Sequence, residues 1–332
     1  MNIGFFELEP WEKEILQKSF PKDNLFFSSK KIAEGRVGKQ ANLDIAVVFV
    51  KSQFNKKVLD KLPKIKMLAT MSTGYDHIDL EECKKRKITV CNVPAYGINT
   101  VAEQAFALIL CLSRKIIAAA NQTSKGTFRQ KGLRGFDLKD KVIGVIGTGN
   151  IGKHVIKIAN GFGMKVIAFD AFKNDKLQKE FNFKYVPLNT LLKTCDILTI
   201  HIPENKDTHH LINKEKLALM KKTAYLINTS RGGIVDTDAL TKALQKKRIA
   251  GAGLDVLEEE KDMFNGDNVV AKDIGKEEMR TVLENHILLE MPNVIVTPHN
   301  AFNTQEAMER ILDTTIKNIK GFKKGRKINV IQ

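Results

Sequence analysis

Short runs of apolar residues recur along the N-terminal third of the chain, and stretches with helical or turn character separate them. An apolar run of roughly four to eight residues between turn residues is typical of a strand that is buried on both faces. The pattern predicts strands at residues 3–8, 25–27, 45–50, 67–71 and 88–91. Because strands that alternate with helices form parallel sheets covered on both sides, we expect an α/β domain here.

A longer segment with helical spacing, residues 99–120, follows Pro94. Its apolar residues recur every three or four positions, at Val101, Ala105, Leu108, Ile109 and Leu112. This spacing predicts one long amphipathic helix, and the polar residues within it exclude a membrane span.

The alternation of apolar runs and helical stretches restarts at Lys141 and predicts strands at residues 142–146, 165–169, 197–200, 224–228, 251–255 and 294–297. A further helical stretch, residues 304–322, follows the last strand, and we expect it to return to the first domain. The sequence therefore predicts two doubly wound parallel-sheet domains. One, at residues 99–299, is inserted into the other, which consists of residues 1–98 and 300–332.

Charge and composition narrow the possible partners. The net charge is +16, but lysines are spread along nearly every predicted helix instead of forming one basic patch. We therefore expect a solvated surface that attracts small anions, with no nucleic-acid groove. Residues 1–10 lack the basic and apolar pattern of a secretion signal, and no apolar run is long enough to span a membrane, which predicts a cytoplasmic protein. The four cysteines are far apart, so we expect them to be reduced and packed as small hydrophobic residues.

A glycine pattern marks a candidate cofactor site. Gly147, Gly149 and Gly152 form G-x-G-x-x-G directly after the strand at 142–146, with Asn150 and Ile151 between the last two. In this Rossmann context the glycines allow a tight turn, close approach of a pyrophosphate and close helix packing. The next strand ends at Asp170, whose carboxylate can bind the ribose hydroxyls and repel a ribose phosphate. This arrangement predicts NAD in preference to NADP, although Lys173 nearby weakens the discrimination.

Three later segments place polar side chains at the carboxyl ends of predicted strands, where ligands bind in open α/β sheets. These side chains are Arg231, Asp255, Glu260 and His299. Reduction of a 2-oxo acid needs a guanidinium to hold the carboxylate and polarise the carbonyl, and a proton donor that titrates near neutrality. We assign the first role to Arg231 and the second to His299.

The histidine also needs a carboxylate on its second ring nitrogen, to favour the imidazolium and fix the ring. We favour Glu260, but chemistry alone leaves its neighbours Glu258 and Glu259 open. The two acids that do not pair with the histidine are expected to be solvated.

Residues 228–236 (NTSRGGIVD), residues 253–256 (GLDV) and the Thr297-Pro298-His299 sequence resemble the D-2-hydroxyacid dehydrogenase family, and the resemblance covers essentially the whole chain. It implies a Rossmann-type NAD domain inserted into a flavodoxin-like substrate domain, and a homodimer built with the long helix at the join. It also implies that Arg231, Glu260 and His299 form the catalytic set, which resolves the choice among the three acids.

The same resemblance implies further contacts. In the substrate domain, the backbone N–H groups of Ser72, Thr73 and Gly74 would hold the substrate carboxylate. Tyr96 and Phe302 would line the substrate site. The remaining cofactor contacts would come from Pro203, Thr229 and Asp255.

Within the family, the chain resembles D-lactate dehydrogenases most, because it has a phenylalanine at position 302, after the histidine. This resemblance predicts pyruvate and D-lactate as substrate and product, although Asn300 stands where a threonine is usual. Reductases of glyoxylate, hydroxypyruvate, phosphoglycerate or branched 2-oxo acids remain alternatives. A protein of another class, an NAD-sensing corepressor, carries the same motifs. The histidines other than His299 show no spacing typical of metal ligands, and hydride transfer needs no metal, so we expect no metal site.

Overall fold

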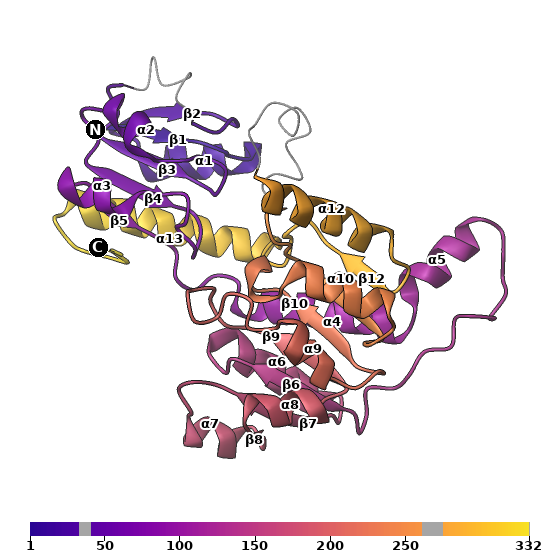
Figure 1. The fold of residues 1–332 in the computed structure, drawn as a ribbon. Coiled ribbons are helices and arrows are strands. Elements are labelled where there is room, and N and C mark those ends of the chain that lie inside the picture. Colours follow the sequence, from indigo (N-terminus) through magenta and orange to yellow (C-terminus); the bar gives the residue numbers. More distant parts are fainter. Residues whose placement is uncertain (33–40, 261–274, 332) are drawn as a thin grey trace. The chain divides into compact units, whose positions relative to one another are not determined.

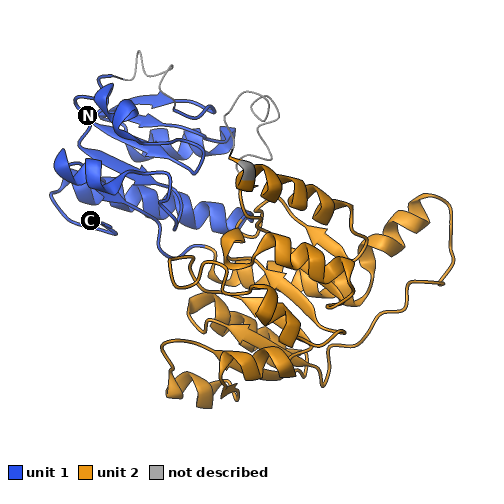
Figure 2. Ribbon diagram, in the orientation of Figure 1, with its two compact units in different colours: residues 1–96, 303–332 blue, residues 97–302 orange. Residues whose placement is uncertain are grey.

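The computed structural model describes residues 1–32, 41–260 and 275–331. The chain divides into two compact units, shown in Figure 2. Unit 1 consists of residues 1–96 and 303–332, and unit 2 of residues 97–302. The predicted domain boundaries lie at 98/99 and 299/300.

Unit 1 contains a five-stranded parallel sheet with the order β2-β1-β3-β4-β5. This is the flavodoxin-like order, in which the strands are added toward one edge of the sheet up to β2 and toward the other edge from β3 onward. The strands are β1 (Asn2–Phe5), β2 (Asn24–Phe27), β3 (Ile45–Val48), β4 (Met67–Thr70) and β5 (Thr89–Cys91). Every side chain of β3 and β4 is buried, which explains why these strands read as uninterrupted apolar runs.

The helices of unit 1 are α1 (Pro10–Ser19), α2 (Lys56–Asp60), α3 (Leu80–Lys85) and α13 (Gln305–Lys323). Helix α13 is the stretch predicted at 304–322. Figure 1 shows it, in yellow, alongside the sheet of unit 1, where it contacts β4. Its buried residues Ile311, Leu312, Ile316 and Ile319 join the same hydrophobic cluster as Phe5. The C-terminal helix therefore completes the core that the N-terminal strands begin.

Unit 2 contains a seven-stranded parallel sheet with the order β12-β11-β10-β9-β6-β7-β8. Its strands are β6 (Val142–Ile146), β7 (Lys165–Phe169), β8 (Lys184–Tyr185), β9 (Ile197–Ile200), β10 (Tyr225–Asn228), β11 (Gly251–Leu254) and β12 (Val294–Val296). The order is that of a Rossmann sheet with one added edge strand, so the predicted pair of doubly wound domains is confirmed. Strand β8 was not predicted, because two residues are too few to form an apolar run.

The helices of unit 2 are α4 (Ile98–Ser113), α5 (Ile116–Ser124), α6 (Asn150–Gly161), α7 (Asp175–Glu180), α8 (Leu188–Thr194), α9 (Lys214–Leu219), α10 (Thr237–Gln245) and α12 (Lys276–Glu290), with a 3-10 turn η3 (Gly232–Ile234). Two hydrophobic clusters cover the sheet. One includes α8, α9 and α10, and the other includes α4 and α6. Among the described residues, no helix combines the length and apolar character that crossing a bilayer requires.

The prediction of a single helix over residues 99–120 is wrong. The chain forms α4 and α5, and Lys115 between them has a left-handed φ of 54°. The carbonyl of Ser113 accepts a hydrogen bond from the backbone N–H of Phe136 at 2.9 Å, so a distant segment crosses the end of α4. Gly135 makes this crossing possible, because a Cβ there would lie 2.0 Å from that carbonyl oxygen. Apolar spacing continues through the break, and for this reason the sequence pattern does not reveal it.

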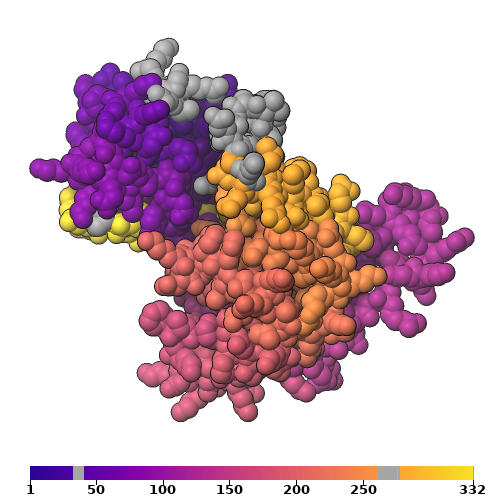
Figure 3. Space-filling model, viewed as in Figure 1, coloured from indigo at the N-terminus to yellow at the C-terminus, as the bar shows by residue number. Residues whose placement is uncertain are grey.

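Helix α5 differs from α4 in its environment. Helix α4 buries half of its residues, whereas α5 buries none, and Ile116 and Ile117 are 48% and 43% exposed. Figure 3 shows this segment, in magenta, standing out from the rest of unit 2.

All four cysteines are free thiols. Cys83, Cys91 and Cys195 are buried, and Cys111 is partly buried. Burial raises the pKa of the Cys83 and Cys91 thiols to about 11 and that of Cys195 to about 12. These three thiols are therefore protonated and unreactive at neutral pH.

Candidate active site

The glycine loop between β6 and α6 has the geometry that the sequence predicts for each glycine. Gly147 has a φ of +90°, and a Cβ there would lie 2.5 Å from the carbonyl oxygen of His201. At Gly152 a Cβ would lie 1.9 Å from the carbonyl oxygen of Gly147, so the helix packs directly on the turn. At Gly149 a Cβ would meet nothing within 4 Å. That open space is where a pyrophosphate can approach the backbone, and the loop therefore fits a dinucleotide.

The N-terminus of α6 is available to an anion. Gly149 is the N-cap residue, and no side chain caps the helix. Asn150 is exposed, whereas Ile151 is partly buried and packs on the core. The first-turn N–H groups, which have no partner inside a helix, can therefore bind phosphate oxygens together with the positive end of the helix dipole.

Asp170, at the end of β7, is fixed by the glycine loop itself. Its Oδ2 accepts hydrogen bonds from the backbone N–H of Thr148 at 2.6 Å and from the Thr148 hydroxyl at 2.9 Å. Its Oδ1 accepts a bond from the N–H of Phe172 at 2.9 Å. The hydroxyl of Tyr185 lies 2.8 Å from that of Thr148 and extends this network. Sequence reasoning missed Thr148, which occupies a variable position of the glycine pattern, and Tyr185, which lies outside it.

Arg231 follows β10 and begins the η3 turn. The side-chain amide of Asn228 donates to the carbonyl oxygen of Arg231 at 2.8 Å, and the Nη1 group of Arg231 donates to the carbonyl oxygen of Ser230 at 2.8 Å. In residues 1–32, 41–260 and 275–331, the guanidinium has no carboxylate partner. At Gly232 a Cβ would lie 2.1 Å from the carbonyl carbon of Leu257, so this turn lies directly against the segment that leads to Glu260.

His299 follows β12 and has a left-handed φ of 51°. Its Nδ1 lies 2.6 Å from Oε1 of Glu260, and the side chains of His299 and Glu260 are 43% and 25% exposed. The second oxygen of Glu260 accepts a hydrogen bond from the N–H of Leu257 at 3.2 Å. The Nε2 nitrogen of His299 has no partner in the described part of the chain, so it is available to a substrate.

The neighbouring acids have different environments. The Oε1 of Glu258 lies 2.7 Å from Nε2 of His210, and its Oε2 accepts a hydrogen bond from the Thr237 hydroxyl at 2.8 Å. The side chain of Glu258 is only 14% exposed. The expectation that both neighbours of Glu260 are solvated is therefore wrong for Glu258, while Glu259 is exposed.

Asp255, at the end of β11, is 1% exposed. Its carboxylate accepts hydrogen bonds from the N–H groups of Asn300 at 2.9 Å and Ala301 at 2.8 Å, and from the hydroxyl of Thr297. Burial raises the pKa of Asp255 despite these three bonds. The backbone carbonyl of Asp255 also accepts from the N–H of His299 at 2.8 Å. Asp255 thus holds the loop that carries His299, and its contact with a cofactor remains a prediction.

Two other predicted cofactor contacts lie at the ends of β9 and β10. Thr229 is 7% exposed, and its hydroxyl has no hydrogen-bond partner within the described residues. A buried hydroxyl without a partner is unfavourable unless a ligand or water binds it, which fits a contact with the dinucleotide. Pro203 is exposed, and its carbonyl accepts a hydrogen bond from the Thr208 hydroxyl at 2.7 Å.

In unit 1, the predicted substrate loop follows β4. The Ser72 hydroxyl donates to the carbonyl oxygen of Gly74 at 2.6 Å, and the Thr73 hydroxyl donates to that of Val93 at 2.8 Å. The backbone N–H groups of Ser72, Thr73 and Gly74 donate to no group in the described chain. Such a run of free donors can bind a carboxylate.

The last two predicted substrate contacts flank the boundaries of the units. Tyr96 packs on the hydrophobic cluster of unit 1, and its carbonyl accepts a hydrogen bond from Nε of Arg310 at 2.7 Å. In unit 2, Phe302 is partly buried, and a Cβ at Gly97 would lie 4.0 Å from it.

The strands β10, β11 and β12 are adjacent and parallel, so Arg231, Asp255 and His299 share the carboxyl edge of one sheet. A dinucleotide loop on the same sheet, followed by an acid-backed histidine and a guanidinium that has no carboxylate partner among the described residues, defines an NAD-dependent oxidoreductase.

Comparison with known proteins agrees with this class. Residues 106–301 match the NAD-binding domain of the D-isomer specific 2-hydroxyacid dehydrogenases. The glyoxylate reductase of Thermococcus litoralis is 36% identical over 328 residues, which cover 97% of this chain and 88% of the relative. The chain therefore belongs to the family of NAD-dependent D-2-hydroxyacid dehydrogenases.

Solved structures are similar over nearly the whole chain. The D-lactate dehydrogenase of Aquifex aeolicus complexed with NAD and lactic acid is 36% identical, with a TM-score of 0.84, and covers 98% of this chain and 96% of its own. The pyruvate reductase of Chlamydomonas reinhardtii is 35% identical, with a TM-score of 0.88, and covers 98% of this chain and 97% of its own.

Proposed function

We propose that this enzyme reduces pyruvate to D-lactate with NADH. The observation that carries the reaction is the 2.6 Å contact between His299 and Glu260, on the sheet edge that also carries Arg231. Among the described residues, Nε2 of this histidine has no partner. The choice of pyruvate rests on Phe302 after the histidine motif and on similarity to solved proteins named as D-lactate dehydrogenase and pyruvate reductase.

In the proposed mechanism each residue has one task. NADH, held by the glycine loop at Gly147, Gly149 and Gly152, would supply a hydride to the carbonyl carbon of the 2-oxo acid. The free N–H groups at Ser72, Thr73 and Gly74 in unit 1, the substrate domain of this proposal, bind the substrate carboxylate. Arg231 stabilises the negative charge that develops on the carbonyl oxygen. The Nε2–H of the His299 imidazolium then donates its proton to that oxygen, which forms the hydroxyl group and leaves a neutral imidazole.

Glu260 acts through the histidine. Its carboxylate, on Nδ1, stabilises the imidazolium and directs Nε2 toward the substrate. Reduction consumes the imidazolium form, so its rate should fall at high pH. The reverse oxidation needs the neutral imidazole and should rise.

The test is a panel of 2-oxo acids (pyruvate, glyoxylate, hydroxypyruvate, 2-oxoisocaproate and phenylpyruvate) assayed by loss of NADH absorbance and repeated with NADPH. The proposal predicts the highest kcat/KM with pyruvate and NADH, and oxidation of D-lactate but not L-lactate. A preference for glyoxylate would instead favour the activity for which the Thermococcus litoralis relative is named. Binding of NADH without turnover of any 2-oxo acid would favour the corepressor-like alternative.

We further propose that α5 belongs to a homodimer interface. Its exposed Ile116 and Ile117, followed by Phe128 at 83% exposure, leave an apolar surface that a second copy of this chain can cover. Light scattering should show a dimer for the native protein and a monomer for the double variant Ile116→Lys, Ile117→Lys. The matched control Ile15→Lys, at a residue that is 38% exposed in unit 1, should leave the dimer intact. A double variant that remains dimeric would contradict the proposal.

A further inference from the structure

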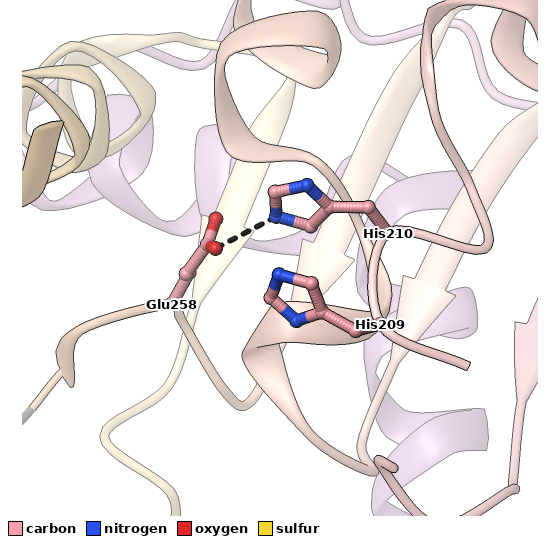
Figure 4. Close-up of side chains that lie close together, drawn as sticks. All are labelled: His209, His210 and Glu258. Atoms are coloured by element: carbon pink, nitrogen blue, oxygen red, sulfur yellow. Dashed lines mark hydrogen bonds and ion pairs between the residues drawn. The ribbon is translucent and has the colours of Figure 1, made fainter. Parts of the chain in front are cut away.

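A second group of titratable side chains lies beside the active-site segment. His209 and His210 belong to the connection between β9 and α9, and Glu258 follows β11. Figure 4 shows the two imidazole rings stacked next to the carboxylate, with a nitrogen of each ring turned toward it. The ring centroids are 4.0 Å apart at an interplanar angle of 19°. One potential ligand atom from each residue lies within 4.8 Å of the other two.

Neighbouring residues orient two of the three side chains. The Nδ1 of His209 lies 3.0 Å from Oε1 of Glu204, which leaves its Nε2 for the interior of the cluster. The Oε2 of Glu258 accepts a hydrogen bond from the Thr237 hydroxyl at 2.8 Å, which leaves Oε1 facing His210 at 2.7 Å. A histidine that bonds a carboxylate through one nitrogen and offers the other is the usual arrangement around zinc in proteins.

We propose that His209, His210 and Glu258 bind one Zn²⁺ ion, with water as the fourth ligand. Two imidazoles and one carboxylate are a common zinc ligand set, whereas Mg²⁺ and Ca²⁺ prefer oxygen ligands alone. Ligand atoms about 2.0–2.2 Å from a tetrahedral zinc ion lie about 3.3 Å from one another. The His210–Glu258 contact of 2.7 Å therefore has to open slightly, and the widest separation, at most 4.8 Å, has to close. Both changes are within the reach of side-chain rotation.

Solvent access supports a fourth ligand from water. The side chains of His209 and His210 are 51% and 38% exposed, whereas Glu258 is 14% exposed. The ion would tie the connection after β9 to the segment that carries Glu260. This zinc site takes no part in hydride transfer, and the inference does not rest on the proposed function.

The sequence did not reveal the cluster. Adjacent histidines are not a recognised ligand spacing, and Glu258 lies 48 positions after His210. The two histidines follow β9 and Glu258 follows β11, and these segments come together because β9, β10 and β11 are neighbours in the sheet.

The test uses the full chain, stripped with EDTA, dialysed and titrated with Zn²⁺ in a calorimeter. We expect one equivalent of zinc per chain. Co²⁺ in place of zinc should give the visible absorption of a tetrahedral complex. His209→Gln and Glu258→Gln should each weaken zinc binding by at least about tenfold, and Glu204→Gln should weaken it by a smaller factor through the loss of ring orientation.

His286→Gln is the matched control, because His286 is exposed on α12, outside the cluster, and its Nδ1 lies 2.8 Å from the Val282 carbonyl oxygen. This variant should bind zinc as the native protein does. Circular dichroism and NADH binding verify that each variant is folded, and Glu204→Gln tests the site without changing a ligand. Equal zinc affinity in the native protein, His209→Gln and Glu258→Gln would overturn the proposal, as would the absence of stoichiometric zinc binding to the native chain.

Discussion

The substitution Glu260→Gln tests the acid–histidine pair at the active site. The change removes the negative charge next to Nδ1 of His299 but keeps the size of the side chain. A hydrogen bond between charged groups contributes about 1.5–3 kcal/mol. Because the side chains of His299 and Glu260 are 43% and 25% exposed, solvent screens the pair and the lower end of that range applies.

A loss of about 1.5 kcal/mol corresponds to a roughly tenfold lower kcat/KM for reduction. The rate should fall because the carboxylate no longer stabilises the imidazolium that donates the proton. Steady-state rates of NADH oxidation with pyruvate, measured across about pH 6 to 9, give both the size of the loss and its pH dependence. The NADH dissociation constant, measured by fluorescence, should not change.

Glu259→Gln is the matched control, since it removes the same charge from an exposed neighbour. It should retain native activity at every pH. If Glu260→Gln kept the native rate and pH profile, or if Glu259→Gln showed the same loss, the assignment of Glu260 as the partner of His299 would be wrong.

Three further substitutions test other parts of the structure. Arg231→Lys keeps the positive charge but loses the planar pair of donors, and kcat/KM should fall by about 10²-fold or more with NADH affinity unchanged; a near-native rate would contradict its role. Gly149→Ala adds a methyl group to open space, so the protein should fold but bind NADH at least about tenfold more weakly. Gly152→Ala should instead lower the melting temperature, because the new Cβ would lie 1.9 Å from the Gly147 carbonyl oxygen. Equal melting temperatures of the two variants would contradict this distinction. Burial raises the pKa of Glu12 from 4.5 to about 7, so the native state holds a proton that the unfolded chain releases, and the stability of the fold falls as pH rises from 4.5 through 7. Glu12→Gln should therefore raise the melting temperature relative to the native protein at about pH 8 but not at about pH 4. An equal effect at both pH values would refute burial as the cause.

Much of the fold could be predicted because parallel strands buried on both faces leave continuous apolar runs. Strands β6, β7 and β9 begin and end at the predicted residues, and the other predicted strands are present with shifted ends. The glycine loop could also be predicted, since a Cβ at Gly147 or Gly152 would clash with backbone atoms, and Gly149 leaves the open space that a pyrophosphate needs.

The remaining features depend on contacts between distant segments. The break at Lys115 follows from the crossing of residues near Phe136, which the apolar spacing of α4 and α5 does not record. The support of His299 by buried Asp255 arises because β11 and β12 are neighbours in the sheet. The partners of Glu258 likewise come from two other connections, so three adjacent acids with similar sequence context have different environments.

The most direct test of the proposed mechanism is a crystal structure of the enzyme with NADH and oxamate, an unreactive analogue of pyruvate. We predict that Nε2 of His299 and the guanidinium of Arg231 both lie within hydrogen-bond distance of the oxamate carbonyl oxygen, with Glu260 still on Nδ1. Oxamate bound beside the nicotinamide ring with the His299 imidazole remote from that oxygen would contradict the account.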